Sequence, residues 1–485
     1  MDQNLTLQLL ALKEEFEDYK EYTSKNIDSF FLCTMALIIF LMQCGFAFLE
    51  AGAVRSKNTT NIIFKNVLDS LFALVCYWTC GWGLAYGPGE GFLEHLFGQS
   101  EFFLVGTNDY TKFFFQYVFA ATAATIVAGA VAERCEIVAY IVYCCSISAV
   151  VYPILTHWGW HESGWMAQGF WISDQEKTEY LDFAGSGVVH LCGGTISFIA
   201  AYIMGPRIGR FPDDSGEVSG EIKGHSVPFA SLGGFILMFG FLAFNGGSTG
   251  SITAPGIGKI VSRAMVNTML SGTMAAFTCL IVHYKMKGKL TLLFTINACL
   301  AGMVSAFAVH AGGGSWGLFA ACLVSHKGIC YAVSNAITGH GWQWLPVAQL
   351  FWQIVCAFAI ITWSFATMVP VFLLLKKYGK LRVPAEIEIK GLDIYKHGEA
   401  AYPLHAYGHG WDEFEPIRTT KKISVLNPEI SLEQLASAYD AMSHKKSVYH
   451  NPSGFEHPEL HGVAKYKKQV PKPTQSGKEN GAFNA

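Results

Sequence analysis

Charged residues are scarce in this sequence. Asp, Glu, Lys and Arg make up 15% of its 485 residues, whereas soluble chains carry about 25%. A chain that is disordered throughout needs much charge and few aromatic residues, and the aromatic content of 14% excludes that class. The formal net charge of −3 gives no general attraction to nucleic acid, so we expect no nucleic-acid partner.

Motifs of several large enzyme classes are also absent. The sequence has no Walker loop, GxSxG elbow, HExxH helix or dinucleotide fingerprint in a suitable context. The 13 cysteines lie in apolar stretches without a CxxC…CxxC arrangement, which favours buried helix residues over a disulfide set or a zinc site. We therefore expect no enzyme, no cofactor and no metal site.

Apolar residues are what the sequence has in abundance. They make up 51% of the chain, and the mean hydropathy is +0.30. A membrane-spanning helix needs about 20 predominantly apolar residues, so the predicted fold class is an all-α polytopic membrane protein. We expect nine spans, at roughly residues 29–50, 67–86, 113–132, 136–157, 184–205, 226–246, 264–286, 290–324 and 345–375.

Three segments flank the transmembrane domain, which is predicted at residues 29–375. Residues 1–28 form a polar N-terminal segment, and the first span is expected to act as its own insertion signal. Residues 376–402 follow the last span. Residues 403–485 lose the apolar runs and are rich in His, Lys, Pro, Ser and Gly, which predicts a largely disordered tail.

Loop charge indicates the orientation. The loops after spans one, three, five and seven, with the start of the tail, carry 14 Lys and Arg residues, and the opposite side carries 8. Because cytosolic loops are enriched in Lys and Arg, we expect the N-terminus outside and the C-terminus in the cytosol. The sequon Asn4-Leu5-Thr6 fits an extracellular N-terminus. The expected location is the plasma membrane.

Two paired motifs indicate an internal repeat. The stretches 189–194 and 309–314 both read V-H-x-x-G-G, and 48–52 loosely resembles 243–247. Inverted repeats are common in transporters. The interval between the paired motifs is 140 residues in the first half and 65 in the second. Three further spans need about 60 residues before any loop is counted, so the second half is predicted to lack two spans.

The two histidines of the repeated motif, His190 and His310, are functional candidates. A histidine in a membrane span is either satisfied by a neighbouring helix or part of a polar pathway, and the matched pair favours the pathway. Two neutral imidazoles can share a proton without placing a fixed charge in the membrane. A metal site is the weaker interpretation, since no carboxylate or thiolate partner lies nearby in the sequence.

Other polar and aromatic residues allow two interpretations each. Asp182 precedes the His190 helix and can act as its N-cap or as an anion that favours a cation. Trp158 and Trp160 fit an aromatic belt or a cation–π surface. Phe119 and Phe244 by themselves are typical core or lipid-facing residues.

Several of these motifs together resemble the ammonium transporter (Amt/Mep/Rh) superfamily, most closely its Amt branch. The resemblance covers roughly residues 28–402. It is carried by Met42-Gln43 with Gly45-Phe46-Ala47, Arg55-Ser56-Lys57-Asn58, Ala132-Glu133-Arg134, residues 182–194, Gly391-Leu392-Asp393, His397-Gly398-Glu399 and Ala401-Tyr402.

The resemblance implies a homotrimer that conducts ammonium or ammonia, with one pathway in each subunit. It implies that His190 and His310 line the pore and that Phe119 and Phe244 form its gate. Trp160, Ser248 and Asp182 would belong to the outer ammonium site. The residues Gly391, Asp393, His397, Gly398 and Glu399 would belong to a regulatory tail that contacts neighbouring subunits.

One departure from the family pattern leaves a second function open. Members of the family usually have eleven spans, and here the stretch 296–305 resembles the start of span eight but runs directly into a stretch that resembles span ten. Loss of two spans keeps the orientation of the later chain, but it need not preserve the wall of the pore. The alternative function is therefore a transport-inactive subunit that regulates intact partners, or an ammonium sensor.

Overall fold

The computed structural model describes residues 3–211, 222–304, 310–324, 328–339 and 342–402. All of them belong to one compact unit, residues 1–415. The predicted tail 403–485 lies outside the described residues.

Helices make up nearly all of the regular structure. Those before residue 205 are α1 (Gln3–Phe40), α2 (Met42–Ala53), η1 (Ser56–Asn58), α3 (Thr59–Cys76), η2 (Tyr77–Gly81), α4 (Trp82–Tyr86), η3 (Phe92–His95), η4 (Phe102–Leu104), α5 (Tyr110–Val131), α6 (Ile137–Ser146), η5 (Ile147–Val151), α7 (Tyr152–Trp160), α8 (Trp165–Gln168), η6 (Ser186–Leu191) and α9 (Cys192–Met204). Those after it are α10 (Val227–Gly247), α11 (Ile257–Lys287), α12 (Leu292–Val304), α13 (His310–Val324), α14 (Ile329–Ile337), α15 (Leu345–Lys377), α16 (Ala385–Lys390) and η7 (Asp393–His397).

A short hairpin is the sole sheet among the described residues. Its strands β1 (Phe170–Trp171) and β2 (Lys177–Thr178) pair antiparallel, with Phe170 opposite Thr178. The hairpin connects α8 to the segment that leads into η6.

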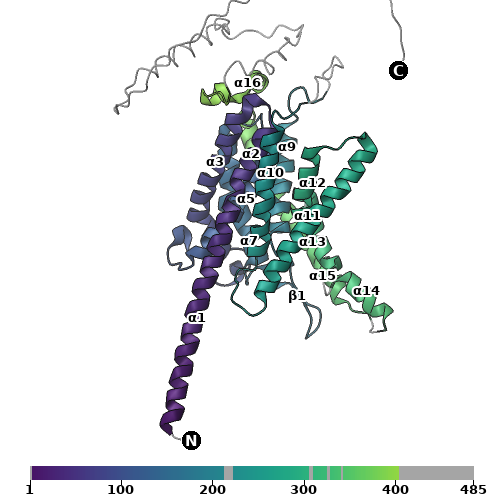
Figure 1. Cartoon of the computed structure of the whole chain (residues 1–485). Coiled ribbons are helices and arrows are strands. Elements are labelled where there is room, and N and C mark those ends of the chain that lie inside the picture. The colour runs from purple at the N-terminus through teal and green to yellow at the C-terminus, as the bar shows by residue number, and fades with distance from the viewer. Residues whose placement is uncertain (1–2, 212–221, 305–309, 325–327, 340–341, 403–485) are drawn as a thin grey trace, which may run out of the picture. The chain divides into compact units, whose positions relative to one another are not determined.

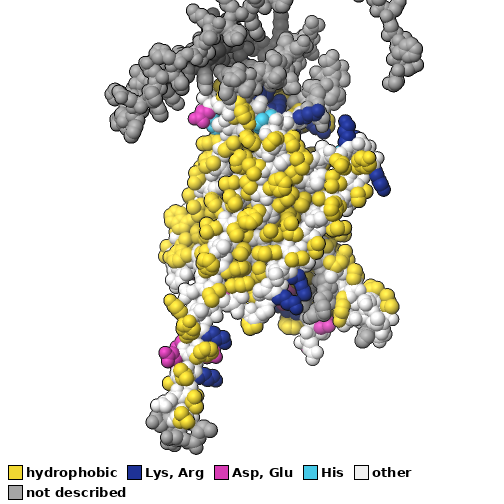
Figure 2. All heavy atoms as spheres, in the orientation of Figure 1, with side chains coloured by type: hydrophobic (Ala, Val, Ile, Leu, Met, Phe, Trp, Pro, Cys, Tyr) yellow, Lys and Arg dark blue, Asp and Glu magenta, His cyan; other side chains and the backbone are white. Residues whose placement is uncertain are grey.

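The described residues contain nine helical stretches that are long and apolar enough to cross a membrane. Figure 2 shows apolar side chains over the surface of the bundle, with Lys and Arg side chains gathered toward its ends. The predicted all-α polytopic class is confirmed.

The eighth span was predicted in the wrong place. The stretch 290–324 is not one helix, because α12 ends at Val304, α13 begins at His310, and the candidate span runs from Gly314 to Ile337. A single helix of 35 residues would be about 52 Å long, far more than the membrane core of about 30 Å. The residues between α12 and α13 lie outside the described residues.

The N-terminal segment is helical. Residues 3–28 are the start of α1, which continues without a break into the first span, and the extracellular location of this segment stays a prediction. In Figure 1, α1 extends beyond the other helices at the end of the bundle away from α16.

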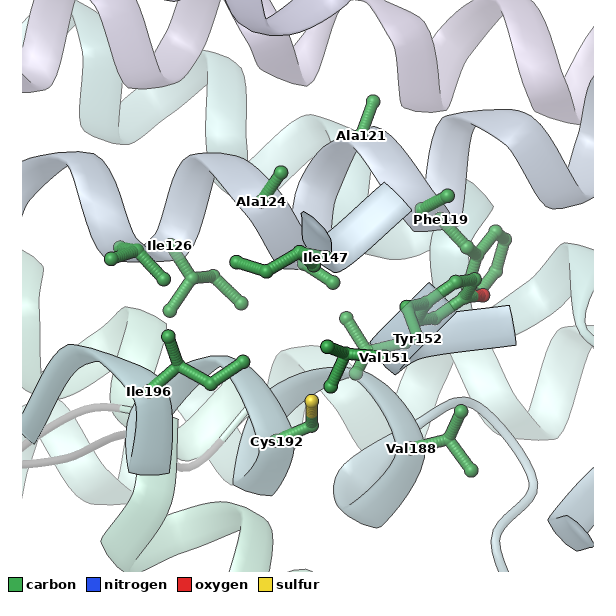
Figure 3. Close-up of a cluster of buried hydrophobic side chains, with 14 of the residues drawn as sticks. Phe119, Ala121, Ala124, Ile126, Ile147, Val151, Tyr152, Val188, Cys192 and Ile196 are labelled. Carbon is green, nitrogen blue, oxygen red and sulfur yellow. The ribbon is translucent and has the colours of Figure 1, made fainter. Parts of the chain in front are cut away.

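One part of the core lies between α5, η5, α7 and α9. Ile126, Ile147, Val151 and Ile196 meet there (Figure 3), and all four are buried. Five of the fifteen buried residues of α5 are alanines, so neighbouring helices can approach α5 closely at these positions.

The helices α2 and α10 cross in close contact through glycines. A Cβ atom on Gly233 would lie 2.2 Å from the backbone nitrogen of Leu49, and one on Gly52 would lie 2.3 Å from that of Ala230. These helices carry the loosely matching motifs at 48–52 and 243–247, but the motif on α2 lies against the start of α10, whereas Gly247 of the other motif lies against Met35 of α1.

Candidate functional site

A continuous row of aromatic rings runs through the bundle. It begins at Trp160, the last residue of α7, and passes to Phe119 of α5, with ring centroids 5.9 Å apart. Phe119 lies 4.1 Å from Phe244 of α10, and Phe244 lies 5.6 Å from His190 of η6. His310, the first residue of α13, ends the row at 5.3 Å from His190.

The two histidines face each other through their Nδ1 atoms. These atoms are 3.2 Å apart, and the ring planes differ by 14°. One Nδ1 must donate and the other accept, so the pair fits two neutral imidazoles of opposite tautomers. His190 is 3% exposed. Neutral rings are the form that a buried position favours, because burying a charge there is costly.

The segment that carries His190 is π-helical and is held by Asp182. The carboxylate of Asp182 accepts hydrogen bonds from the backbone N–H groups of Gly185 (2.8 Å), Gly187 (2.9 Å) and Val188 (3.0 Å). Gly185 has φ +92°, a conformation that favours glycine. These contacts agree with the N-cap interpretation of Asp182, because they satisfy backbone N–H groups at the start of the helical segment that carries His190. Burial raises the pKa of Asp182, against the effect of these N–H donors.

The donor hydrogens of Trp160 and Ser248 are already used within the protein, whereas the Ser248 oxygen can still accept a hydrogen bond. The Trp160 indole N–H donates to the backbone oxygen of Asp182 at 2.7 Å, and the Ser248 hydroxyl donates to that of Phe244 at 2.7 Å. The hydrogen bond fixes the Trp160 ring, so its face rather than its N–H is what it can offer to a cation.

A cavity of about 260 Å³ lies beside the histidine row. Its lining includes His190, Asn245 of α10, Thr268 of α11 and Met303 of α12. Gly317 and Ala321 of α13 also line it. The cavity therefore lies next to the junction between α12 and α13, where the sequence predicts missing spans.

Sequence reasoning missed a group of buried ionisable residues between α2, α3 and α6. The Glu50 carboxylate accepts from the Asn66 amide at 2.7 Å, and Asp69 accepts from the Tyr140 hydroxyl at 2.6 Å. Lys65 donates to the backbone oxygen of Cys135 at 3.0 Å and is 1% exposed. The signal was available, since ionisable residues within a span are functional candidates by default.

The predicted regulatory segment docks on the start of α3. Asp393 accepts hydrogen bonds from the backbone N–H groups of Thr60 (3.1 Å) and Asn61 (2.8 Å), and the Asn61 amide lies 2.8 Å from Nε2 of His397. Gly391 has φ +101° and packs against Lys57. Burial raises the pKa of Asp393 to about 6, although the backbone N–H donors oppose this shift.

The other two residues of that segment lie at its end. Gly398 follows η7 with φ +65°, and Glu399 borders a cavity between α3 and α10. In the described residues this segment contacts its own chain, and its predicted contact with neighbouring subunits stays a prediction.

Fold and site together define a class: a polytopic helical membrane protein with a ring-lined path that joins helices of both halves. Comparison with known proteins identifies the family. The Ammonium Transporter Family model matches residues 29–306 and 304–402, and the chain belongs to this family. A Caenorhabditis elegans relative is 54% identical, with 90% of this chain and 93% of that protein covered.

More distant relatives agree. The ammonium transporter Amt2 of Archaeoglobus fulgidus is 33% identical over 80% of this chain and 90% of its own length. A solved structure named a sensor Amt protein matches with a TM-score of 0.64 and 29% identity, covering 78% of this chain and all of that one. The relatives are named as transporters, which points to a role other than catalysis.

The comparisons also support the predicted deletion. The alignment with the nematode relative runs over 499 positions but covers 90% of 485 residues, so about 60 positions of the relative face no residue here. The two matched stretches of the family model meet at residues 304–306. This is the junction at which the sequence predicts two missing spans.

Proposed function

We propose that the protein carries ammonium across a membrane, along the row of rings from Trp160 to His310. The observation that carries this proposal is the continuity of the row, whose neighbouring ring centroids are 4.1 to 5.9 Å apart. The names of the relatives support ammonium as the substrate.

Ammonium would be recruited at the Trp160 end. Its charge is strongly hydrated, and moving it bare into an apolar interior is prohibitive. The fixed indole face of Trp160 can compensate part of this cost through a cation–π contact. Ser248 would add a hydroxyl contact, and the buried Asp182 would favour positive charge at the same end.

The stacked pair Phe119 and Phe244 would then act as the gate. The two rings leave no room for a hydrated ion at 4.1 Å, so ammonia would pass after losing its proton. His190 and His310 would carry the proton beside this path, because paired neutral imidazoles can both accept and donate. Potassium cannot lose a proton or donate a hydrogen bond, so the same path would reject it.

We further propose a homotrimer in the plasma membrane, with the N-terminus outside and the C-terminus in the cytosol. The excess of Lys and Arg on the loops of the tail side supports the orientation. Family membership supports the trimer.

Ammonium uptake in a transport-deficient cell tests the proposal. The chain is compared with His190→Ala and with His283→Ala at equal surface expression. His283 lies on α11, where its ring forms a hydrogen bond with the Thr291 hydroxyl, and it serves as the matched control. We expect uptake by the parent and by His283→Ala, and a loss of about a hundredfold for His190→Ala, the lower end of what positioned proton-transfer groups contribute. Absence of uptake by a folded parent at the cell surface would contradict transport.

A second candidate is a regulatory subunit or ammonium sensor. The missing segment and the cavity beside His190 favour it, since both concern the wall of the pathway. One of the similar structures is named a sensor. Co-purification with a full-length relative, together with altered uptake by that relative, would support this candidate. Independent migration of the two proteins would count against it.

A further inference from the structure

Residues 3–27, the start of α1, form a helical projection that the bundle does not cover. Asp28 marks its base, where its carboxylate accepts from the backbone N–H groups of Ile252 (2.7 Å) and Thr253 (2.9 Å). The large apolar side chains before it are exposed, including Leu12 at 62%, Phe16 at 61% and Tyr19 at 66%. At 1.5 Å per residue, the helix from Leu5 to Asp28 is about 35 Å long.

The apolar residues from Leu5 to Tyr19 follow a heptad repeat, in which spacings of four and three residues alternate four times. The same spacing continues through the polar residues Thr23 and Asn26 to Phe30. The d positions are Leu5, Leu12, Tyr19 and Asn26, and the a positions are Leu9, Phe16, Thr23 and Phe30. A period of 3.5 keeps one stripe facing a partner helix along its length, which is the pattern of a coiled coil.

The charges beside this stripe fit a parallel arrangement of identical helices. Lys13 and Lys20 fall at e positions, and Glu15 falls at a g position. In a parallel coiled coil, a g residue meets the e residue five positions later on the next helix. Glu15 would therefore meet Lys20 of a second copy. Lys20 contacts Glu17 of its own helix at 3.4 Å and is well exposed, so it can reach either partner.

The same stripe continues onto the membrane part of the first span. Phe30, Leu37 and Cys44 continue the seven-residue spacing and are exposed. Against its own bundle the helix instead buries Ala36 and Ile39. A second copy could therefore approach along the whole stripe without displacing any helix of the first.

We propose that the projection, residues 3–27, forms a parallel coiled coil with the projections of other copies of this chain. The parallel direction follows because all copies insert into the membrane in one orientation. The proposal rests on the homo-oligomer given under the proposed function but not on transport, and the tests below do not measure uptake.

Disulfide trapping in native membranes tests the contact. Leu12→Cys places a thiol at d, where identical positions of parallel helices meet. Glu14→Cys places one at f, on the outer side of the same turn, and is the matched control. Under mild oxidation of the full chain, we expect at least about tenfold more homodimer from Leu12→Cys than from Glu14→Cys. The parent gives the background from the 13 native cysteines.

Other outcomes of the trapping overturn the proposal. Equal trapping at both positions would indicate random collision, and absence of trapping at Leu12→Cys would show that the stripe does not meet itself. An adduct whose mass differs from twice that of the chain would assign the stripe to another partner.

Charge reversal gives an independent test of the register. Lys20→Glu places like charges opposite each other, and we expect the detergent-solubilised oligomer to dissociate at a lower temperature. Adding Glu15→Lys should restore the original temperature. Failure of the double variant to recover would overturn the proposed pairing of Glu15 with Lys20.

Discussion

Two spans of equal mean hydropathy differ strongly in how much of each is buried inside this protein. In the most apolar windows of α5 and α11, which have the same mean hydropathy, 83% and 11% of the residues are buried. Five buried alanines on α5 allow neighbouring helices to approach closely, whereas α11 buries just Val261, Thr268, Gly272 and Ala276, along one narrow seam. The apolar pattern therefore shows that a helix can span a membrane, but not whether it faces protein or lipid.

The two spans belong to different regions of the bundle. We call α2 to α10, which include α5, the closed region, and this region holds Trp160, Phe119, Phe244 and His190. The open region, from α11 to α14, follows it and contains residues 304–306, where the two matched stretches of the family model meet. Removal of two spans would uncover helices that remain, and this accounts for the exposure of α11 in physical terms.

We expect the largest effect from replacing a glycine of the closed region, with a glycine of α11 in the open region as the control. Gly233→Leu drives a side chain into the backbone of α2 at Leu49, whereas a Cβ on Gly258 of α11 has its nearest contact at 3.8 Å. We expect Gly233→Leu to abolish accumulation of folded protein and Gly258→Leu to change stability by less than about 0.5 kcal/mol. Surface abundance and size-exclusion profiles measure both. Tolerance of Gly233→Leu would show that α2 and α10 do not cross as described.

Two tryptophans allow a comparison of function rather than folding. Trp160 ends α7 in the closed region, and Trp344 precedes α15 with 68% of its surface exposed. Loss of a desolvated cation–π contact costs about 2 kcal/mol, or roughly thirtyfold in affinity. We expect Trp160→Leu to raise the ammonium concentration for half-maximal uptake by about this factor and Trp344→Leu to leave it unchanged. Equal behaviour of the two variants would remove Trp160 from the proposed site.

The sequence predicted the pairing of the histidines because the repeated V-H-x-x-G-G motif places both at matching points of two related segments. Their Nδ1 atoms lie 3.2 Å apart. Phe119 and Phe244 required the family resemblance, since a phenylalanine in an apolar helix has no pattern of its own. The junction between α12 and α13 was predicted from the unequal spacing of the paired motifs and from the family resemblance, but the ends of the two helices were not, because hydropathy continues across the stretch 290–324. The helical projection was missed because its charged residues hide the heptad spacing.

The tail segment 391–398 docks on α3 of the closed region, and its docking should respond to pH. Burial raises the pKa of Asp393 to about 6, from about 3.9 in an exposed carboxyl. The docked form binds the proton more tightly, so docking is strongest below pH 4 and weakens as the pH rises to 6. Relative to pH 7.5, the docking constant should rise about twofold at pH 6 and about tenfold at pH 5.

Hydrogen exchange of the amides of residues 391–398, corrected for the intrinsic pH dependence, measures this docking. Asp393→Asn cannot titrate and keeps one acceptor oxygen for the backbone N–H groups of Thr60 and Asn61. Its protection should not vary over this pH range. The same pH dependence in Asp393→Asn would assign the effect to another group, with His397 the nearest alternative.

The smallest expected effect is also the most direct measure of what α11 faces. Ile126 lies in the closed core of Figure 3 and is 7% exposed, whereas Ile281 on α11 is 57% exposed. In a membrane protein the apolar transfer term largely vanishes, because lipid is as apolar as the core, and the packing term remains. Ile126→Val should therefore cost about 0.5–1 kcal/mol, the lower part of the range for this change, and Ile281→Val about zero. Thermal unfolding of the full chain in lipid nanodiscs measures both. A cost for Ile281→Val equal to that for Ile126→Val would mean that this face of α11 is packed against protein in the membrane, and the contrast between the two regions would then belong to the isolated chain alone.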